Sequence, residues 1–406
     1  MTWPRQHPMM GFSLIELMVG MFIGLIGIVV IFQAFAAFEG QKRTSTAGAD
    51  AQETGLMALQ NIEREARMAG IGLLYKAQPL CTRLNVYNST AIPTTLPFLP
   101  VVITDGGDVA SDTLTVSYST SPYSMSPAML METLDKSWSG SIKVKNDGNG
   151  GRIVVKDLLL LGQFDLPTGT ARDCTLITVT KVTGNSDKTQ PITVEAATGT
   201  TPNINPGSST KLSYAQEATA VMKVGDLDDA LSTTDRTLII DRFLRNADGT
   251  LTVDNLVDNS NVPTIIANNV VAVQAQYGVA TTPNGPITAW VNASNKNADK
   301  IDWANPTSEQ AVLIKAIRIA VVTRSAGLEK PEDTNKDGVV DALDAPTQAC
   351  ADSSKVKLFD GPCIWSTRDD NIGFKLDLSG TSNWNWFRYR SYETVIPLRN
   401  VIWGNV

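Results

Sequence analysis

The chain has 406 residues, of which 43% are hydrophobic and 18% charged, so it contains enough apolar material to build a folded core. Its 34 lysines and arginines against 41 aspartates and glutamates give a net charge of −7. Because this composition is mildly acidic and has no basic run, we expect no nucleic-acid partner. The only histidine is His7, so imidazole catalysis is excluded for any form of the chain that lacks its first residues. We therefore do not expect an enzyme.

The N-terminal region is dominated by an apolar segment, residues 12–38, in which Glu16 is the only charged side chain. A helix of that length spans about 40 Å, which is enough to cross a bilayer. A secretory signal peptide has a shorter apolar part, followed by a cleavage site such as residues 34–36. A plain membrane anchor accounts for the length but leaves a carboxylate at membrane depth unexplained.

Residues 11–17, Gly-Phe-Ser-Leu-Ile-Glu-Leu, resemble the type IV prepilin signal, which accounts for both features. The resemblance implies that a prepilin peptidase cuts between Gly11 and Phe12 and methylates the new terminus at Phe12. It also implies that Glu16 neutralises the terminal ammonium of a neighbouring subunit and so sets the register of assembly. Since the cut precedes the apolar segment, residues 12–38 would stay on the mature protein as its anchor.

Residues 39–75 are expected to continue this helix as an amphipathic half that packs on the protein's own head domain. Apolar residues at steps of three or four positions lie on one helix face. The stripe consists of Leu56, Leu59, Ile62, Ala66, Ala69 and Leu73. The run Gly70-Ile71-Gly72 is typical of a helix end.

Residues 76–406 are expected to form a β-rich head, because short apolar runs, some of them alternating, are separated by loops rich in Gly, Asn, Ser, Thr and Pro. The predicted strands are Leu114–Tyr118, Arg152–Val155, Thr175–Val182, Thr237–Asp241, Val270–Val279, Ile314–Thr323, Val356–Phe359 and Tyr392–Val401. The fold class predicted is α+β, with a long N-terminal helix packed on a β-rich head.

An ordered series of segments sharpens the family resemblance. The segments are residues 112–116, 173–174, 269–279, 316–325 and 388–400. Behind a prepilin signal, this series resembles PilW, a family of type IV minor pilins, over nearly the whole chain. One departure is that residues 69–72 contain no Cys where many relatives have one close by.

The resemblance implies a protein of the bacterial inner membrane with a single span and a periplasmic head. It would join other minor pilins and the major pilin in a complex that primes the filament and sits at its tip, with a tip adhesin as a further candidate partner. No residue would be catalytic.

Four cysteines, Cys81, Cys174, Cys350 and Cys363, lie in the head. In an oxidising periplasm they are expected to form disulfides, and four cysteines allow three pairings. We favour Cys350–Cys363, which closes a short loop, together with Cys81–Cys174; buried free thiols are the alternative.

Residues 333–344 match the twelve-residue calcium loop. The predicted ligands are Asp333, Asn335, Asp337, the carbonyl of Val339, Asp341 and Asp344, with Gly338 at the sharp turn. Asp344 is shorter than the usual Glu at the last position, and no helix is predicted to precede the loop, so a dockerin-like or isolated loop fits better than an EF-hand. The alternative is a solvated turn.

Aromatic residues gather near the C-terminus. They are Trp384, Trp386, Phe387, Tyr389, Tyr392 and Trp403. We expect them to serve strand packing and a subunit interface, in preference to an exposed sugar platform.

The predicted organisation is a leader at 1–11, a membrane or filament-core helix at 12–38, the second half of the stem at 39–75 and the head at 76–406. Two other functions remain open. One is a type II secretion pseudopilin, which carries the same signal and stem. The other is a membrane-anchored binding domain whose dockerin-like loop docks a partner.

Overall fold

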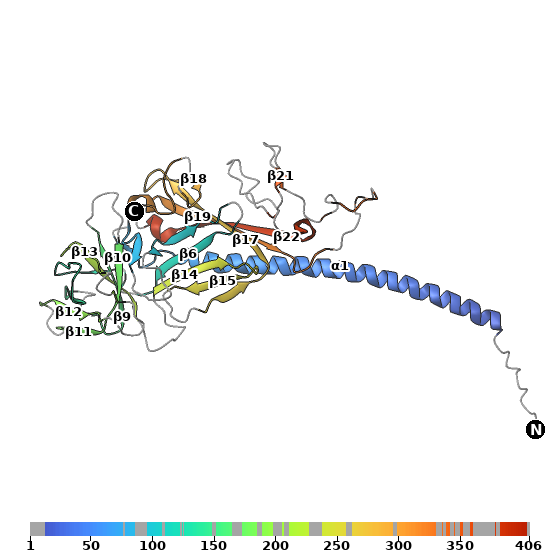
Figure 1. The fold of residues 1–406 in the computed structure, drawn as a ribbon, viewed down its shortest axis with the longest axis horizontal. Coiled ribbons are helices and arrows are strands. Elements are labelled where there is room, and N and C mark those ends of the chain that lie inside the picture. Colours follow the sequence, from blue (N-terminus) through green and yellow to red (C-terminus); the bar gives the residue numbers. More distant parts are fainter. Residues whose placement is uncertain are drawn as a thin grey trace, which may run out of the picture. The chain divides into compact units, whose positions relative to one another are not determined.

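The structure is a computed structural model. It describes residues 13–75, 78–85, 96–107, 110–121, 124, 126–147, 152–164, 173–184, 189–197, 205–206, 211–226, 238–256, 262–294, 299–329, 335, 338–341, 345, 350–351, 358–359, 378 and 382–403. These residues form an α+β fold that consists of an N-terminal apolar helix and a β-rich body with several sheets (Figure 1). The predicted fold class is confirmed in this form.

The helix α1 spans Leu14–Met68, a stretch of 55 residues without a proline. It ends just before Gly70, whose φ of 81° is a left-handed conformation that glycine adopts without strain. The contacts of the chain divide it into two units after Asp50, so α1 contributes to both. Within the first unit, Leu14–Ala36 is long and apolar enough to cross a membrane, judged by length and composition.

Two antiparallel sheets of the second unit lie against the end of α1. One has four strands in the order β18–β17–β19–β22. The other has five strands in the order β16–β15–β14–β6–β5. Their bounds are β5 Val101–Thr104, β6 Thr113–Ser119, β14 Leu238–Arg245, β15 Leu251–Asn255, β16 Thr264–Ala267, β17 Val270–Ala280, β18 Ile287–Val291, β19 Ile314–Arg324 and β22 Tyr389–Pro397.

The chain between β6 and β14 supplies most of two further sheets. One has six strands in the order β4–β3–β10–β9–β13–β7, and the other has three in the order β11–β12–β8. Their bounds are β3 Arg83–Asn85, β4 Leu96–Pro97, β7 Ala128–Met129, β8 Ser141–Val144, β9 Asp157–Gln163, β10 Asp173–Thr178, β11 Lys181–Thr183, β12 Ile192–Glu195 and β13 Thr219–Asp226.

Short elements complete the described residues. They are β1 Leu74–Tyr75, β2 Gln78–Pro79, β20 Cys350–Ala351, β21 Leu358–Phe359, α2 Ser308–Ala311, η2 Trp384–Trp386 and α3 Arg399–Trp403. The helix α2 begins with a capping box, in which Thr307 and Gln310 each bond the other's backbone N–H.

The largest hydrophobic core lies between α1 and the four- and five-stranded sheets. From α1 it takes Ala58, Leu59, Ile62 and Ala66, and from the sheets residues such as Val321. A second core joins the six-stranded sheet to the back of the five-stranded one, and a third lies between the six- and three-stranded sheets. The end of α1 is therefore the helical wall of a β-rich core, as its amphipathic pattern predicts.

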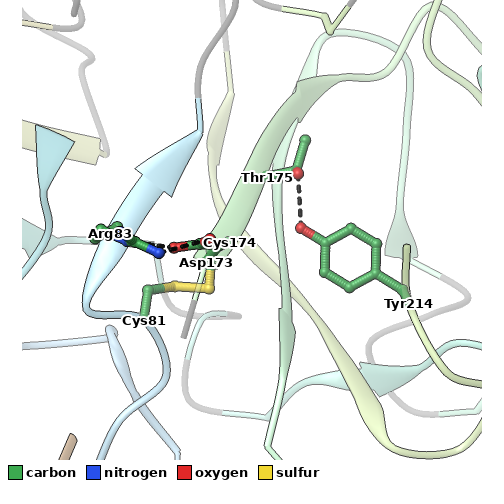
Figure 2. Close-up of a disulfide and its surroundings, with 6 residues drawn as sticks. All are labelled: Cys81, Arg83, Asp173, Cys174, Thr175 and Tyr214. Carbon is green, nitrogen blue, oxygen red and sulfur yellow. Dashed lines mark hydrogen bonds and ion pairs between the residues drawn. A yellow bond between two sulfur atoms is a disulfide. The ribbon is translucent and has the colours of Figure 1, made fainter. Parts of the chain in front are cut away.

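A disulfide between Cys81 and Cys174 ties the segment just before β3 to β10 in the second core (Figure 2). The two Cα atoms are 5.5 Å apart, and both residues are at most 1% exposed. Beside it, Arg83 makes two bonds to the carboxylate of Asp173, of 2.6 and 3.0 Å. This is one of the two pairings favoured from the sequence; the other, Cys350–Cys363, involves Cys363, which lies outside the described residues.

Several details predicted from the sequence are wrong. Leu56 is 41% exposed rather than buried, because the small residues Ala51 and Gly55 face the sheets instead. Residues 152–155 form no strand; they lead into a turn at Lys156, whose φ is 78°. The segment Thr175–Val182 divides between β10 and β11.

The C-terminal predictions also need correction. The strand predicted for Tyr392–Val401 begins at Tyr389 and ends at Pro397, and α3 follows because the chain turns away from the sheet after Leu398. Of Val356–Phe359, the described part, Leu358–Phe359, forms β21.

Candidate functional site

The start of α1 carries the residue that the sequence marks most clearly, Glu16. Its carboxylate accepts a hydrogen bond of 3.0 Å from the backbone N–H of Ser13, and its own N–H donates to Oγ of Ser13 at 3.4 Å. This is a capping box, which satisfies two N–H groups at the helix start. The Ser-x-x-Glu spacing is visible in the sequence, but we did not predict the cap from it. Gly11 and Phe12 lie outside the described residues.

Beyond Glu16, α1 presents large apolar side chains on all sides. From Leu14 to Ala36 each described side chain is exposed, and Phe32 is 70% exposed. A Cβ placed on Gly20, Gly24 or Gly27 would meet no atom within 4 Å. In water such an exposed apolar surface would be strongly unfavourable.

The β-strands of the second unit contact α1 closely where this unit begins, at Ala51 and Gly55. Thr323 on β19 donates a hydrogen bond of 2.8 Å from Oγ1 to the carbonyl of Ala51. One turn further on, a Cβ at Gly55 would overlap the ring of Tyr392 on β22. Gly55 therefore allows α1 to approach β22 closely. Neither contact was predicted, because both depend on pairing across more than 250 residues of chain.

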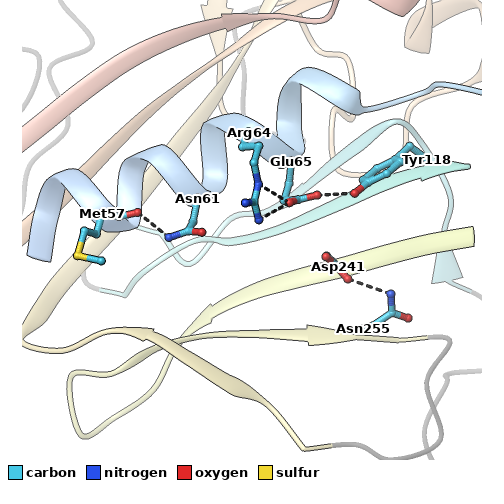
Figure 3. Close-up of polar contacts among 7 residues, drawn as sticks. All are labelled: Met57, Asn61, Arg64, Glu65, Tyr118, Asp241 and Asn255. Atoms are coloured by element: carbon cyan, nitrogen blue, oxygen red, sulfur yellow. Dashed lines mark hydrogen bonds and ion pairs between the residues drawn. The ribbon is translucent and has the colours of Figure 1, made fainter. Parts of the chain in front are cut away.

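A polar contact joins α1 to the five-stranded sheet (Figure 3). Tyr118 on β6 donates a hydrogen bond of 2.5 Å to the carboxylate of Glu65. Arg64 lies on the outer side of the same carboxylate at 2.9 Å. Burial, and then the bond to Glu65, raise the pKa of Tyr118, so its hydroxyl stays a donor. On neighbouring strands, Asn255 donates to Asp241 at 2.9 Å.

A buried carboxyl group connects the two sheets that contact α1. Asp112 is only 4% exposed, and its carboxylate accepts backbone N–H bonds from Gly106 (2.9 Å) and Ala275 (2.7 Å). Its own N–H donates to the carbonyl of Val273. Burial raises the pKa of Asp112 to about 7, and the two backbone donors only partly offset this effect. No motif in the sequence pointed to it.

The predicted calcium loop is described only in part. Asp333, Asp337 and Asp344 lie outside the described residues. Asn335, Val339 and Asp341 are exposed, and Gly338 has a φ of 92°, as a sharp turn requires. Among the residues that the structure describes, no group of three or more His, Cys, Asp or Glu could hold a metal ion. Calcium binding therefore stays a prediction.

Two of the C-terminal aromatic residues pack against a small core. Trp384 and Tyr389 lie against a small core of Ala272, Ala320, Val322 and Leu378. This core covers the face of the four-stranded sheet that points away from α1. Strand packing, the role preferred from the sequence, holds for these two residues.

Comparison with known protein families shows a match to part of the chain. The family model for Type IV Pilus-assembly protein W, PilW, matches residues 242–400, which run from β14 to α3. The match covers less than half of the chain, but it includes the four-stranded sheet that grips α1. It supports membership of the PilW family and involvement in type IV pilus assembly. No curated protein and no solved structure matches the chain.

Proposed function

We propose that this protein is a minor pilin that takes part in type IV pilus assembly. It is made as a precursor, cut between Gly11 and Phe12 by a prepilin peptidase, and held in the inner membrane by Leu14–Ala36 with its head in the periplasm. It then joins other minor pilins and the major pilin in the complex that primes the filament and remains at its tip. We propose no catalytic role for it.

Two observations together support this proposal, one on the N-terminal helix and one on the C-terminal part of the chain. At the start, a carboxylate at the first turn of α1 precedes a run of apolar side chains that are exposed among the described residues. Toward the end, residues 242–400 match a family of pilus-assembly proteins. An apolar helix explains an anchor alone; together with the family match, it favours a helix that moves from the membrane into a filament.

Glu16 has two uses in this account. In the single chain its carboxylate caps its own helix through Ser13. In the filament it pairs with the terminal ammonium of a neighbour's Phe12, inside an apolar bundle where an unpaired charge would be costly. The cap holds the Glu16 carboxylate at the N-terminal end of α1 until the neighbour's terminal ammonium binds it. The pairing role therefore builds on the capping role.

The test separates these two roles. Glu16→Gln keeps an acceptor for the Ser13 N–H but removes the charge, and Ser13→Ala removes the hydroxyl half of the cap but keeps the charge. We expect Glu16→Gln to abolish incorporation and Ser13→Ala to reduce it only slightly, as measured by the amount of this protein in sheared filaments. Normal incorporation of Glu16→Gln would refute the pairing role. Equal membrane levels of both variants serve as the control.

We further propose that the loop at 333–344 binds Ca²⁺ as a structural ion of the head. The left-handed Gly338 and the carboxylate of Asp341 suit an oxygen-rich loop. A chelator is then expected to lower the melting temperature of the full-length protein, and Asp341→Asn is expected to abolish that difference. An identical melting temperature with and without chelator, in protein shown to have bound Ca²⁺, would remove the structural role.

A further inference from the structure

Arginines meet at the corner of the second unit where α1 enters it. Arg245 is the last residue of β14 and Arg324 is the last residue of β19. Both flank the start of β17: the backbone N–H of Arg324 donates to the carbonyl of Asn269 at 3.0 Å, and Nε of Arg245 donates to the carbonyl of Val270 at 3.1 Å. Two strands from different sheets therefore bring two arginines to the start of β17.

We call the place where Arg245 and Arg324 lie the arginine corner. It lies next to a contact between β19 and α1. Thr323, which precedes Arg324, makes the hydrogen bond to the carbonyl of Ala51. Ala51 is the first residue of the second unit. On the next strand, Arg390 lies opposite Thr323 and adds a third, exposed positive charge.

The charge of Asp248 acts on Arg245, but no described carboxylate forms an ion pair with the arginine corner. Arg245, Arg324 and Arg390 form no ion pair with any carboxylate in this part of the chain. Burial, and then the charge of Arg324, lower the pKa of Arg245, and the charge of Asp248 partly offsets them. Asp248 is the nearby acid, but its carboxylate is bound by the N–H and hydroxyl of Thr250, at 2.9 and 2.7 Å. Half-buried like charges are costly unless an anion joins them.

The two guanidinium groups are also held in place. Arg245 is fixed by the Val270 carbonyl, which leaves its remaining N–H donors for another group. Arg324 lies over the ring of Phe387, at 4.3 Å from the centroid. An arginine that is positioned in advance binds a carboxylate in a two-bond geometry at a lower entropic cost than a free one.

We propose that Arg245 and Arg324 together bind a carboxylate side chain of a neighbouring pilin subunit. This inference rests on the proposed function, which brings other subunits against the part of the head next to α1. An anionic membrane fits the arginine corner less well, because lipid-binding clusters usually contain about four to eight basic residues. Here Asp248 adds negative charge beside Arg245. A single carboxylate matches this arrangement better than a charged surface.

The experiment uses a photo-crosslinking amino acid at Ala247, an exposed residue in the turn that follows Arg245. The full-length protein is expressed in cells that assemble pili, with or without Arg245→Gln and Arg324→Gln. We expect a cross-link to an acidic segment of another pilin. Its yield should fall about tenfold in the double variant, which corresponds to about 1.4 kcal/mol. Lys136→Gln, which removes an exposed charge elsewhere on the head, should leave the yield unchanged.

A charge exchange completes the test. With Arg245→Glu and Arg324→Glu, replacing the cross-linked carboxylate of the partner by arginine should restore the cross-link and the filament number. Cross-links to lipid alone, or a pilin cross-link that the double variant leaves unchanged, would overturn the inference. If the inference fails while Glu16→Gln still blocks incorporation, the proposed function stands; if Glu16→Gln is also without effect, the proposed function fails with it.

Discussion

The ring of Tyr392 on β22 occupies the space that a side chain at residue 55 of α1 would need. Alanine normally stabilises a helix by about 1 kcal/mol relative to glycine. At this position the same change would push α1 away from β22, and overpacking of this kind costs about 1–3 kcal/mol. We therefore expect Gly55→Ala to destabilise the head.

The matched control for this prediction is Gly48→Ala, because nothing lies within 4 Å of a Cβ at Gly48. Urea unfolding of the full-length protein in detergent measures both variants. Gly55→Ala should unfold at lower urea than the wild type, whereas Gly48→Ala should not. Combining Gly55→Ala with Tyr392→Ala should recover part of the loss. If Gly55→Ala stabilises the protein as much as Gly48→Ala does, the close approach is wrong.

The disulfide Cys81–Cys174 closes a long loop within the second core, with a sequence separation of 93. Replacing both cysteines by alanine should reduce the free energy of unfolding by about 2–5 kcal/mol. The urea midpoint of the double variant measures this effect, and the wild type under reducing conditions should approach it. An alkylation assay without reductant should leave both residues unlabelled in the wild type. Labelling of either residue in folded, oxidised protein would contradict the pairing.

The hydrogen bond from Tyr118 to Glu65 should stabilise the packing of α1 on the five-stranded sheet. Tyr118→Phe removes the donor and leaves the half-buried carboxylate of Glu65 with one partner fewer, at an expected cost of about 1–3 kcal/mol. Glu65→Gln keeps an acceptor for the hydroxyl and should cost less. Equal unfolding midpoints for wild type and Tyr118→Phe would show that this contact adds nothing to stability.

The pKa of Asp112, raised by burial from 3.8 to about 7, predicts a dependence of stability on pH. Because the folded state holds this proton more tightly than the unfolded state, the free energy of unfolding should fall as pH rises from about 4 to about 7. The slope for a single group is at most about 1.4 kcal/mol per pH unit. Asp112→Asn should remove this component of the slope.

Unfolding at a series of pH values, with the variants in parallel, measures the contribution of Asp112. Asp135→Asn is the control, because Asp135 is exposed and bonds to Ser137 lower its pKa, so its titration lies below this window. A wild type and an Asp112→Asn variant with the same slope between pH 4 and 7 would contradict the prediction.

The local features of α1 could be predicted from the sequence. Its apolar length, Glu16 as the single carboxylate of the apolar segment and the end near Gly70 all follow from residues next to one another. The prediction for Leu56 failed because the buried face near the start of the second unit is lined by Ala51 and Gly55. A search for large apolar residues overlooks such small ones, although close packing of a helix on a strand requires them.

The arrangement of the sheets could not be predicted in the same way. The strand β9 contains an unbroken run of leucines, Leu158–Leu161, buried on both faces. The length of such a run alone cannot distinguish a strand from a buried helix. The order of strands places β3 beside β10 and β6 beside β14, across long stretches of intervening chain. The Asp112 contacts and the arginine corner arise from such long-range pairings, so no short motif announces them.

The most direct test of the central claim is the intact mass and N-terminal sequence of the protein extracted from membranes of cells with an active prepilin peptidase. The account predicts a chain that begins at an N-methylated Phe12, with Glu16 as its fifth residue. A chain that begins at Met1 would indicate a plain anchor, and one that begins at Ala37 would indicate a secreted domain. Either result would contradict assembly through α1.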